Sequence, residues 1–504
     1  MSVKGSLAAN YASQAYVTLL GILVVPVYLK HMGPEAYGLV GFFAVLQAVF
    51  NLLDLGLTPT MARETARLRG GAVSAHDFVR LYRSLTLIFV GTAALGGILL
   101  FALADPIATT WLGSSALHRD DIVAAVQIMG LSVAMRWLGG LYRGVVSGAE
   151  RLVWLSGFNA AIATLRFVGV LGSMALWGFS PQVFFLHQLA VAALELLGLY
   201  GASSRLVPKA PAQELSPGDL LRTVRPTLRF SLTIAFTSTM WVIITQTDKL
   251  LLSGVLPLGE FGYFASAVLV AGGITLITGP VSSVIMPRMA RLHAEGNPAE
   301  VRRIYNSATQ LVAITAGSAA ATMAWCAEPL MYAWTGSREI TDHTADVLRL
   351  YAIGNGLLAL SAFPFYLQYA RGSLRYQFVG NCLMGLALVP SVLYAASNFG
   401  GVGVGSAWVT VNALYLLLWV AYAHRQLEPG LHVKWLRTNV LAVVLPAQAL
   451  AGLLSSLRLD LEDRVLALLY SVGVALACLL GSALGSSDAR GVVRRLWRHN
   501  NTKA

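Results

Sequence analysis

Charged side chains are scarce in this chain. Asp, Glu, Lys and Arg make up 12% of its 504 residues, whereas 56% of the residues are hydrophobic. A soluble globular protein carries about 25% charged residues. A protein in water could not bury so much apolar surface in its core. In a bilayer the same residues can form spanning helices, each of which needs roughly 20 mostly apolar residues. The composition therefore excludes an ordinary soluble protein and indicates an integral membrane protein.

Several motifs are also missing. The three cysteines, Cys326, Cys382 and Cys478, all fall in apolar runs and show neither a disulfide framework nor metal-ligand spacing. No Walker A loop is present, so direct use of ATP is not expected. No extramembrane loop clusters His, Asp or Glu, and no nucleophile or paired-carboxylate arrangement is found. We therefore expect no catalytic residue, no metal and no cofactor, and a protein that is not an enzyme.

Long apolar runs predict an all-α polytopic membrane protein with 14 spanning helices. With both termini in the cytoplasm, most of the 36 lysines and arginines fall in cytoplasmic loops, as basic residues do because they resist translocation. This asymmetry explains the net charge of +12 without nucleic acid as a partner. The helices are expected at approximately Ser6–Leu29, Tyr37–Leu57, Leu85–Ala104, Ile122–Leu141, Ser156–Leu176, Gln182–Ala202, Leu228–Leu252, Gly262–Met286, Ser307–Ala327, Ala345–Phe365, Phe378–Ser397, Val402–Ala423, Val440–Leu457 and Val465–Leu484.

The helices are organised as two similar halves. Shifting the sequence by 224 positions places Gly38 on Gly262 and the Ala-Arg-Leu triplet at 66–68 on that at 290–292. An even number of helices in each half predicts a parallel repeat with the substrate path between the halves. The predicted organisation is an N-lobe of six helices at 1–202, a Pro-rich basic linker at 203–227, a C-lobe of six helices at 228–424, and two peripheral helices with a basic tail at 425–504.

Ionisable residues at membrane depth are costly and usually face a cavity or a partner. Arg166 lies about eleven residues into its helix, roughly 16 Å deep, and Asn159 and Ser173 are seven residues to either side of it. This polar stripe favours a hydrated cavity, and the alternative is a structural pair between Arg166 and Glu195. Arg136 is nearer the inner boundary, where it either faces the cavity or snorkels to the interface.

A second polar face is expected on the seventh helix. Trp241, Thr245 and Asp248 share one side of it, and Lys249 follows directly. Adjacent helix residues point about 100° apart, so we expect Asp248 and Lys249 not to pair with each other. Asp248 either binds a proton or a cation, or anchors the helix to a basic group elsewhere.

Two further carboxylates have open roles. Asp54 shares a helix face with Gln47 and Asn51 and precedes a sequence with a Gly and a Pro, where the helix is expected to end or kink. Asp54 therefore has either a role in ion coupling or a structural role at this break. Glu195 shares a face with His187 and either titrates or neutralises Arg166.

An aromatic and polar stripe runs down the twelfth helix. Trp408, Asn412, Tyr415 and Trp419 follow one another at spacings of four, three and four residues. Such a stripe is more often packing than a platform on which sugars stack, and both interpretations stay open.

The opening resembles that of a known family. Its polar-speckled first helix, SLAANYASQAYVTLLGILVVPVYLKHMGPEAYGLVGFF, followed by NLLDLGLTPTMARETARL, is similar to polysaccharide biosynthesis exporters, including the O-antigen flippases of the multidrug/oligosaccharidyl-lipid/polysaccharide exporter superfamily. The run Thr245-Gln246-Thr247-Asp248-Lys249-Leu250-Leu251 and the six-plus-six-plus-two layout extend the resemblance over nearly the whole chain.

The resemblance implies two lobes that open to alternate sides, with cations in a central cavity that receive a polyprenyl diphosphate. In this chain the cations would be Arg136, Arg166 and Lys249. The remaining candidate contacts to substrate are Asn159, Trp241, Trp408, Asn412 and Tyr415, and Asp248, Glu195 and Asp54 are the candidates for coupling to H+ or Na+. The first helix has no acidic residue, unlike that of most multidrug extruders of the superfamily.

The expected function is therefore export of a lipid-linked oligosaccharide, an O-antigen or exopolysaccharide repeat unit, by a flippase in the bacterial inner membrane. Membrane lipid and a glycan polymerase are the expected partners. The alternatives are an ion-coupled exporter of small molecules or drugs, a membrane glycan polymerase or ligase, and a scaffold that transports nothing.

Overall fold

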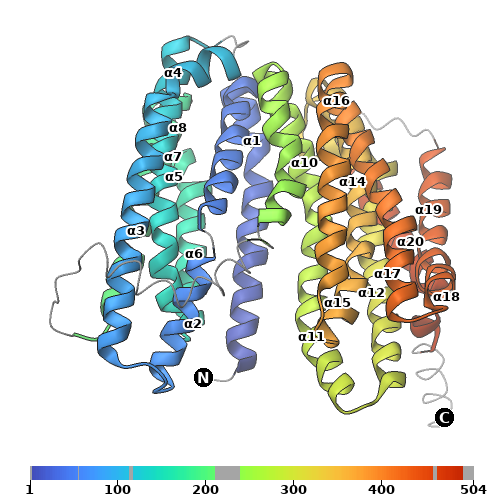
Figure 1. Ribbon diagram of the computed structural model, residues 1–504. Coiled ribbons are helices and arrows are strands. Elements are labelled where there is room, and N and C mark those ends of the chain that lie inside the picture. Colours follow the sequence, from blue (N-terminus) through green and yellow to red (C-terminus); the bar gives the residue numbers. More distant parts are fainter. Residues whose placement is uncertain are drawn as a thin grey trace, which may run out of the picture. The chain divides into compact units, whose positions relative to one another are not determined.

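The computed structural model describes residues 3–54, 56–112, 117–209, 236, 239–457 and 463–491, and the regular elements in these ranges are all helices (Figure 1). The chain divides into two compact units, Met1–Gly262 and Tyr263–Ala504. The predicted linker at 203–227 lies mostly outside the described residues, so the division of the lobes there stays a prediction.

The first unit contains the elements that carry the candidate site. In chain order they are α1 (Val3–Leu52), α2 (Leu57–Arg69), α3 (Ala75–Ala102), α4 (Ala104–Pro106), the π-helix η1 (Ile107–Trp111), α5 (Arg119–Gly148), α6 (Leu152–Thr164), the π-helix η2 (Leu165–Gly169), α7 (Val170–Trp177), α8 (Pro181–Ser204) and a helical segment at 239–255.

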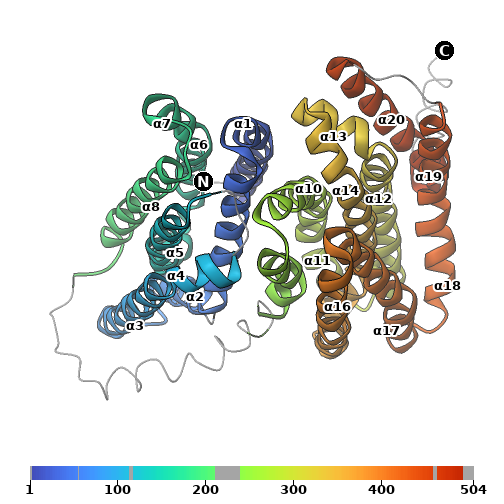
Figure 2. The same ribbon diagram turned by 90° about the horizontal axis from the view of Figure 1, so that it is seen from above.

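The regular elements described in the second unit are also all helices. Its elements are most of α10 (Leu258–Leu276), which begins in the first unit, followed by α11 (Thr278–Ala294), α12 (Pro298–Trp325), α13 (Ala327–Thr335), α14 (Arg338–Ser361), α15 (Phe363–Ala370), α16 (Arg375–Leu414), the π-helix η3 (Tyr415–Trp419), α17 (Val420–Leu427), α18 (Leu431–Trp435), the π-helix η4 (Leu436–Leu441), α19 (Ala442–Ser455) and α20 (Arg464–Gly485). Figure 2 shows α18, α19 and α20 along one side of this unit, where α19 and α20 pack on α12.

The prediction of an all-α membrane protein is confirmed. The described residues contain ten helices that are long and apolar enough to span a bilayer, or eleven if α12 and α13, which meet at 84°, form one bent span. The backbone leaves the helical region at Gly33 in α1 and at Gly400 in α16, so each of these long helices consists of two passes. When α1 and α16 are each counted as two passes and the segment at 239–255 is counted as one, the order of the helices along the chain agrees with the predicted 14 passes.

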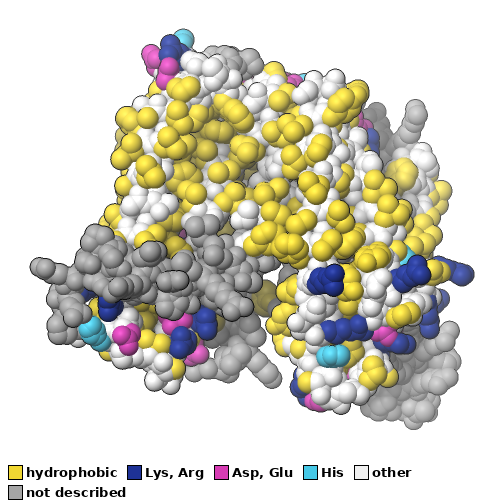
Figure 3. Space-filling model, viewed as in Figure 1, with side chains coloured by type: hydrophobic (Ala, Val, Ile, Leu, Met, Phe, Trp, Pro, Cys, Tyr) yellow, Lys and Arg dark blue, Asp and Glu magenta, His cyan; other side chains and the backbone are white. Residues whose placement is uncertain are grey.

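The surface of each unit agrees with a bilayer environment. Leu176, Leu386 and Leu484 are each at least 70% exposed. Figure 3 shows hydrophobic side chains as a broad band on each unit, with most of the visible Lys and Arg below it. Apolar side chains exposed in such numbers have no place in water but are stable against lipid tails.

The two glycines that mark the repeat have reciprocal contacts. A Cβ atom on Gly38 would overlap the carbonyl oxygen of Leu258, and a Cβ atom on Gly262 would overlap that of Pro34. Pro34 and Leu258 are themselves separated by the shift of 224 positions. Equivalent glycines therefore meet equivalent partners where the start of α10 crosses α1, which supports the internal repeat.

Close packing of α2 on α5 positions the arginines of α5. Gly144 and Gly148, one helical turn apart on α5, lie against the backbone of α2 at Thr58 and Ala62, and a Cβ atom on Gly148 would overlap the carbonyl oxygen of Ala62. Small residues at this spacing let two membrane helices approach closely.

We expect Gly148→Leu to destabilise the first unit by about 2–3 kcal/mol, the upper range for overpacking, because its side chain would meet backbone that cannot rotate away. The measurement is the unfolding temperature of the purified protein in detergent. Gly157→Leu on α6 is the matched control, since nothing lies within 4 Å of a Cβ atom there. Equal losses in both variants would show that the contact between α2 and α5 is not tightly packed.

Candidate functional site

Three arginines of the first unit line one cavity. The cavity has a volume of about 460 Å³ and is lined by the end of α1, the start of α2, α5, η2, α8 and the segment at 239–255. Arg136 and Arg143 come from α5, where their spacing of seven residues places them on one helix face. Arg166 comes from η2. The other lining residues are Gln47, Asn51, Leu52, Asp54, Gly56, Thr58, Pro59, Trp137, Gly140, Glu195, Thr239 and Val242.

Arg136 is held by neutral groups. Its Nη1 donates to Oε1 of Gln47 at 2.7 Å and its Nη2 donates to Oε1 of Gln188 at 2.8 Å. Its guanidinium also lies 5.1 Å from the centre of the Phe43 ring, in the range of a cation–π contact. Among the described residues its Nε has no hydrogen-bond partner. The charge of Arg136 is thus positioned without a carboxylate and is available to an anion.

Glu195 on α8 bridges the other two arginines. Its Oε1 accepts from Arg143 Nη2 at 2.7 Å and its Oε2 accepts from Arg166 Nη2 at 2.6 Å. Arg143 also donates to Oδ1 of Asn159 at 2.8 Å. The Nε of Arg166 has no partner among the described residues. The sequence left open whether Arg166 faces a cavity or pairs with Glu195, and the structure shows both.

The π-helical turn η2 changes the predicted stripe. A π-helix inserts an extra residue, so positions beyond it rotate relative to a regular α-helix. Asn159 and Arg166 contact the same cluster, but Ser173 bonds Nδ1 of His187, whose Nε2 lies 2.9 Å from the carbonyl oxygen of Leu165. The expectation that Ser173 shares the face of Arg166 was therefore wrong.

Asp54 occupies the break between α1 and α2. Its carboxylate accepts from the backbone N–H and the hydroxyl of Thr58, at the first turn of α2. It therefore stabilises the start of that helix and also lines the cavity. The cavity thus combines three cations with two carboxylates, one of which already holds two arginines.

The predicted polar face on the segment at 239–255 does not line this cavity, which receives only Thr239 and Val242 from that segment. Asp248 is 2% exposed and accepts from Nζ of Lys249 at 3.2 Å, while Nζ also donates to the carbonyl oxygen of Thr245 at 2.6 Å. The expectation that Asp248 and Lys249 do not pair was wrong, because the lysine stem is long enough to fold back along the helix. Trp241 is 53% exposed.

The stripe of the second unit is packed inside that unit. The ring of Trp408 stacks on Tyr351, and its Nε1 donates to Oδ1 of Asn355 at 3.1 Å. Asn412 is fully buried and donates to the carbonyl oxygen of Trp408. Tyr415 and Trp419 belong to η3 and lie against Gly380. These contacts account for the stripe as packing, and its proposed role in sugar binding stays a prediction.

Sequence reasoning missed three members of the site. In the sequence Arg143 has the position of an ordinary residue flanking the membrane on the cytoplasmic side, Gln188 does not stand out, and Gln47 is notable only for sharing a face with Asp54. A spacing of seven residues in the sequence could have identified them. Arg136 and Arg143, Asn159 and Arg166, and Gln188 and Glu195 are each separated by seven residues. Residues seven apart on a helix lie on nearly the same face.

Comparison with known proteins agrees with this architecture. A protein of Shigella flexneri described as "Putative O-antigen transporter" is 19% identical over 431 residues, which cover 83% of this chain and 98% of that protein. Among solved structures, the lipid II flippase MurJ in an inward closed conformation matches with a TM-score of 0.69 and 14% identity, covering 94% of this chain and 97% of that one. An inward-facing multidrug resistance transporter of the MATE family, in the MOP superfamily, matches with a TM-score of 0.65 and 15% identity, covering 84% and 96%.

These relatives are named as transporters or as a flippase. The family described as polysaccharide biosynthesis protein matches residues 4–293, more than half of the chain. This match shows that the chain belongs to the polysaccharide biosynthesis protein family, and its long apolar helices make it a multi-pass membrane protein with the fold of these solved structures.

Proposed function

We propose that this protein is a flippase that moves a polyprenyl-diphosphate-linked oligosaccharide, an O-antigen or exopolysaccharide repeat unit, from the cytoplasmic to the outer leaflet of the bacterial plasma membrane. The observation that carries the proposal is the cavity lined by Arg136, Arg143 and Arg166 in the first unit. Charges at membrane depth are retained when they serve a transport path. The similarity to an O-antigen transporter supports a glycan as cargo.

The chemistry of the cavity suits a diphosphate with attached sugars. Guanidinium groups bind phosphate oxygens through charge-assisted, often bidentate hydrogen bonds. A guanidinium has five N–H donors, and the bonds described above use the two Nη atoms of Arg136 and one Nη atom of Arg166, which leaves further N–H groups for such oxygens. The amides of Gln47 and Asn51 line the same cavity and can bond sugar hydroxyls. The lipid tail stays in the bilayer while the polar head crosses.

Alternating access supplies the movement in this proposal, as is common in transporters with internal repeats. Asp54, Glu195 and Asp248 are the candidate sites for coupling to H+ or Na+. Glu195 is the strongest of them, because a proton on its carboxylate would release both arginines to the substrate. Consumption of the glycan outside, for example by a polymerase, is the other source of direction. The basic loops support a cytoplasmic position for both termini.

Export of drugs is the second candidate, because the fold is shared with a multidrug resistance transporter. Most such drugs are cations, and three arginines in the cavity would repel them unless the carboxylates outweighed them. A membrane polymerase or ligase would need catalytic groups in an extramembrane loop, which the sequence does not offer. The charge of the cavity therefore favours an anionic cargo.

The test is the sidedness of lipid-linked glycan in cells depleted of this protein and complemented with wild type or Arg166→Ala. We expect repeat units to accumulate on the cytoplasmic leaflet after depletion, wild type to restore export, and Arg166→Ala to restore less than about a tenth of it, as loss of a charge-assisted hydrogen bond costs about 1.5–3 kcal/mol. If glycan reaches the outer leaflet normally but is not elongated, an enzyme or scaffold role replaces transport.

A further inference from the structure

The second unit contains a basic cavity that is unrelated to the arginine cavity. It has a volume of about 990 Å³ and lies between α12, η4 and the end of α20, and it shares no residue with the site in the first unit. Four cations line it, Arg303, Lys434, Arg437 and Arg490, against the single carboxylate of Asp488. A smaller cavity of about 170 Å³ adjoins it and shares Asn306, Gly430, Lys434 and Asn439.

The cavity has a preformed polar floor. Nδ2 of Asn439 donates to Asn306 at 2.8 Å, and Nε2 of Gln310 donates to Oδ1 of Asn439 at 2.8 Å and to the hydroxyl of Ser487 at 2.9 Å. Oε1 of Gln310 accepts from the hydroxyl of Ser486. These bonds join α12, η4 and the end of α20, so the floor is fixed by satisfied groups rather than by loose side chains.

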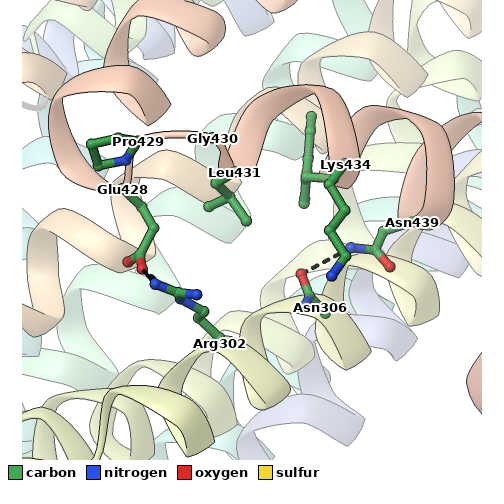
Figure 4. A pocket seen from close by; sticks show the side chains of 9 residues that line it. Arg302, Asn306, Glu428, Pro429, Gly430, Leu431, Lys434 and Asn439 are labelled. Atoms are coloured by element: carbon green, nitrogen blue, oxygen red, sulfur yellow. Dashed lines mark hydrogen bonds and ion pairs between the residues drawn. The ribbon is translucent and has the colours of Figure 1, made fainter.

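The cations above this floor differ in their partners. Arg303 pairs with Glu300, and Glu428 pairs with both Arg302 and Arg371. Figure 4 shows Glu428 facing Arg302 in the smaller cavity, while Lys434 extends toward Asn306 and Asn439. Within the described part of the chain, Lys434, Arg437 and Arg490 form no ion pair. Three exposed cations are thus gathered around one cavity and only Asp488, which accepts from the hydroxyl of Ser307, opposes them.

An apolar surface continues from the same helices. Val433, which lines the cavity, and Leu445 on α19 and Leu484 on α20 are all more than half exposed. In Figure 3, Lys and Arg side chains of this unit lie next to the edge of the hydrophobic band, the level at which lipid headgroups are expected. A ligand that meets both surfaces has an anionic head and apolar chains.

We propose that this cavity binds the phosphate headgroup of an anionic membrane phospholipid, with the acyl chains along the exposed faces of α19 and α20. Basic pockets between transmembrane helices are suited to such headgroups, and each Lys or Arg near the membrane surface contributes to the attraction. The chain's own tail at 492–504 does not suit this cavity, because it contains four Lys or Arg residues and no acidic residue and would be repelled by the cations that line the cavity. The bound lipid ties α18–α20 to α12, and this role is independent of the proposed cargo.

The experiment measures lipid binding to the purified full chain in neutral detergent, by native mass spectrometry and by the shift in unfolding temperature. The probes are cardiolipin, phosphatidylglycerol, phosphatidylcholine and water-soluble glycerol phosphate. We expect the two anionic lipids to bind and to raise the unfolding temperature, phosphatidylcholine to do neither, and the double variant Lys434→Gln/Arg437→Gln to bind cardiolipin on the order of tenfold more weakly.

The matched control is Arg375→Gln/Arg425→Gln, which removes the same charge from exposed positions of the second unit outside both cavities. An equal loss in the control would overturn the proposal, because it would show attraction to net charge alone. Full competition by glycerol phosphate would also overturn it in favour of a soluble anion. Should the double variant unfold without lipid at a lower temperature than wild type, Arg490→Gln serves in its place, and the loss of one charge is expected to weaken cardiolipin binding by about threefold.

Discussion

Arg136→Gln is expected to reduce export of the lipid-linked glycan on the order of 10- to 100-fold while leaving the protein folded. Arg136 is held by the amides of Gln47 and Gln188 and by the ring of Phe43, and no carboxylate depends on it. A glutamine there can bond the same two amides, so no buried ion is left unpaired. The cavity would lose a guanidinium that has a donor to spare, at a cost of about 1.5–3 kcal/mol in binding, which corresponds to a loss on the order of 10- to 100-fold.

The measurement is the rate at which labelled lipid-linked glycan becomes accessible on the far leaflet of vesicles that contain the purified protein. Arg375→Gln, an exposed substitution in the second unit, is the control for the loss of one positive charge and should match wild type. Arg136→Lys should recover part of the rate, because it restores the charge without the planar fork of donors. Wild-type rates in Arg136→Gln would remove this residue from the substrate site.

Glu195→Ala is expected to give the largest loss of stability among single substitutions in the site. It would leave Arg143 and Arg166, which now share one carboxylate, as neighbouring cations with no partner of opposite charge in the cluster. Breaking a buried ion pair by removing one partner costs about 3–5 kcal/mol. Because the Arg143 side chain is 35% exposed, water reduces this penalty, and we expect a value near the lower limit.

The unfolding temperature in detergent measures this effect. Glu195→Gln should cost less, since its amide oxygen can still accept a hydrogen bond, and Glu195→Gln/Arg143→Gln should be more stable than Glu195→Gln alone because the charge balance is restored. A Glu195→Ala protein as stable as wild type would show that the bridge has no structural role. Measuring export by Glu195→Gln distinguishes a role of Glu195 in ion coupling from a role in stability. Loss of export in a protein that is still folded supports the proposed coupling through this carboxylate.

The arginine cluster illustrates what helical spacing can predict. Depth along the apolar runs was sufficient to single out Arg136, Arg166 and Glu195, because charge inside a membrane is rare and stands out in the sequence. Arg143 was missed because its position near the inner boundary matches that of an ordinary flanking residue. Its spacing of seven from Arg136 was the better guide, since helix faces extend beyond predicted boundaries.

The sequence by itself determined the class of this protein. Scarce charge, long apolar runs and basic loops predicted a helical membrane protein, and the shift of 224 positions predicted a repeat that the contacts of Gly38 and Gly262 support. These properties follow from composition and periodicity, because the insertion of each helix into the bilayer depends on the hydrophobicity and the flanking charges of that helix alone.

Only the tertiary structure decided which polar groups meet. It placed Glu195 between two arginines from different helices, Arg136 between two glutamines, and Trp408 inside the packing of the second unit. It also revealed that η2 rotates Ser173 away from Arg166. The rotation of one helix against another depends on side-chain packing between them, and no periodicity within a single helix contains that information.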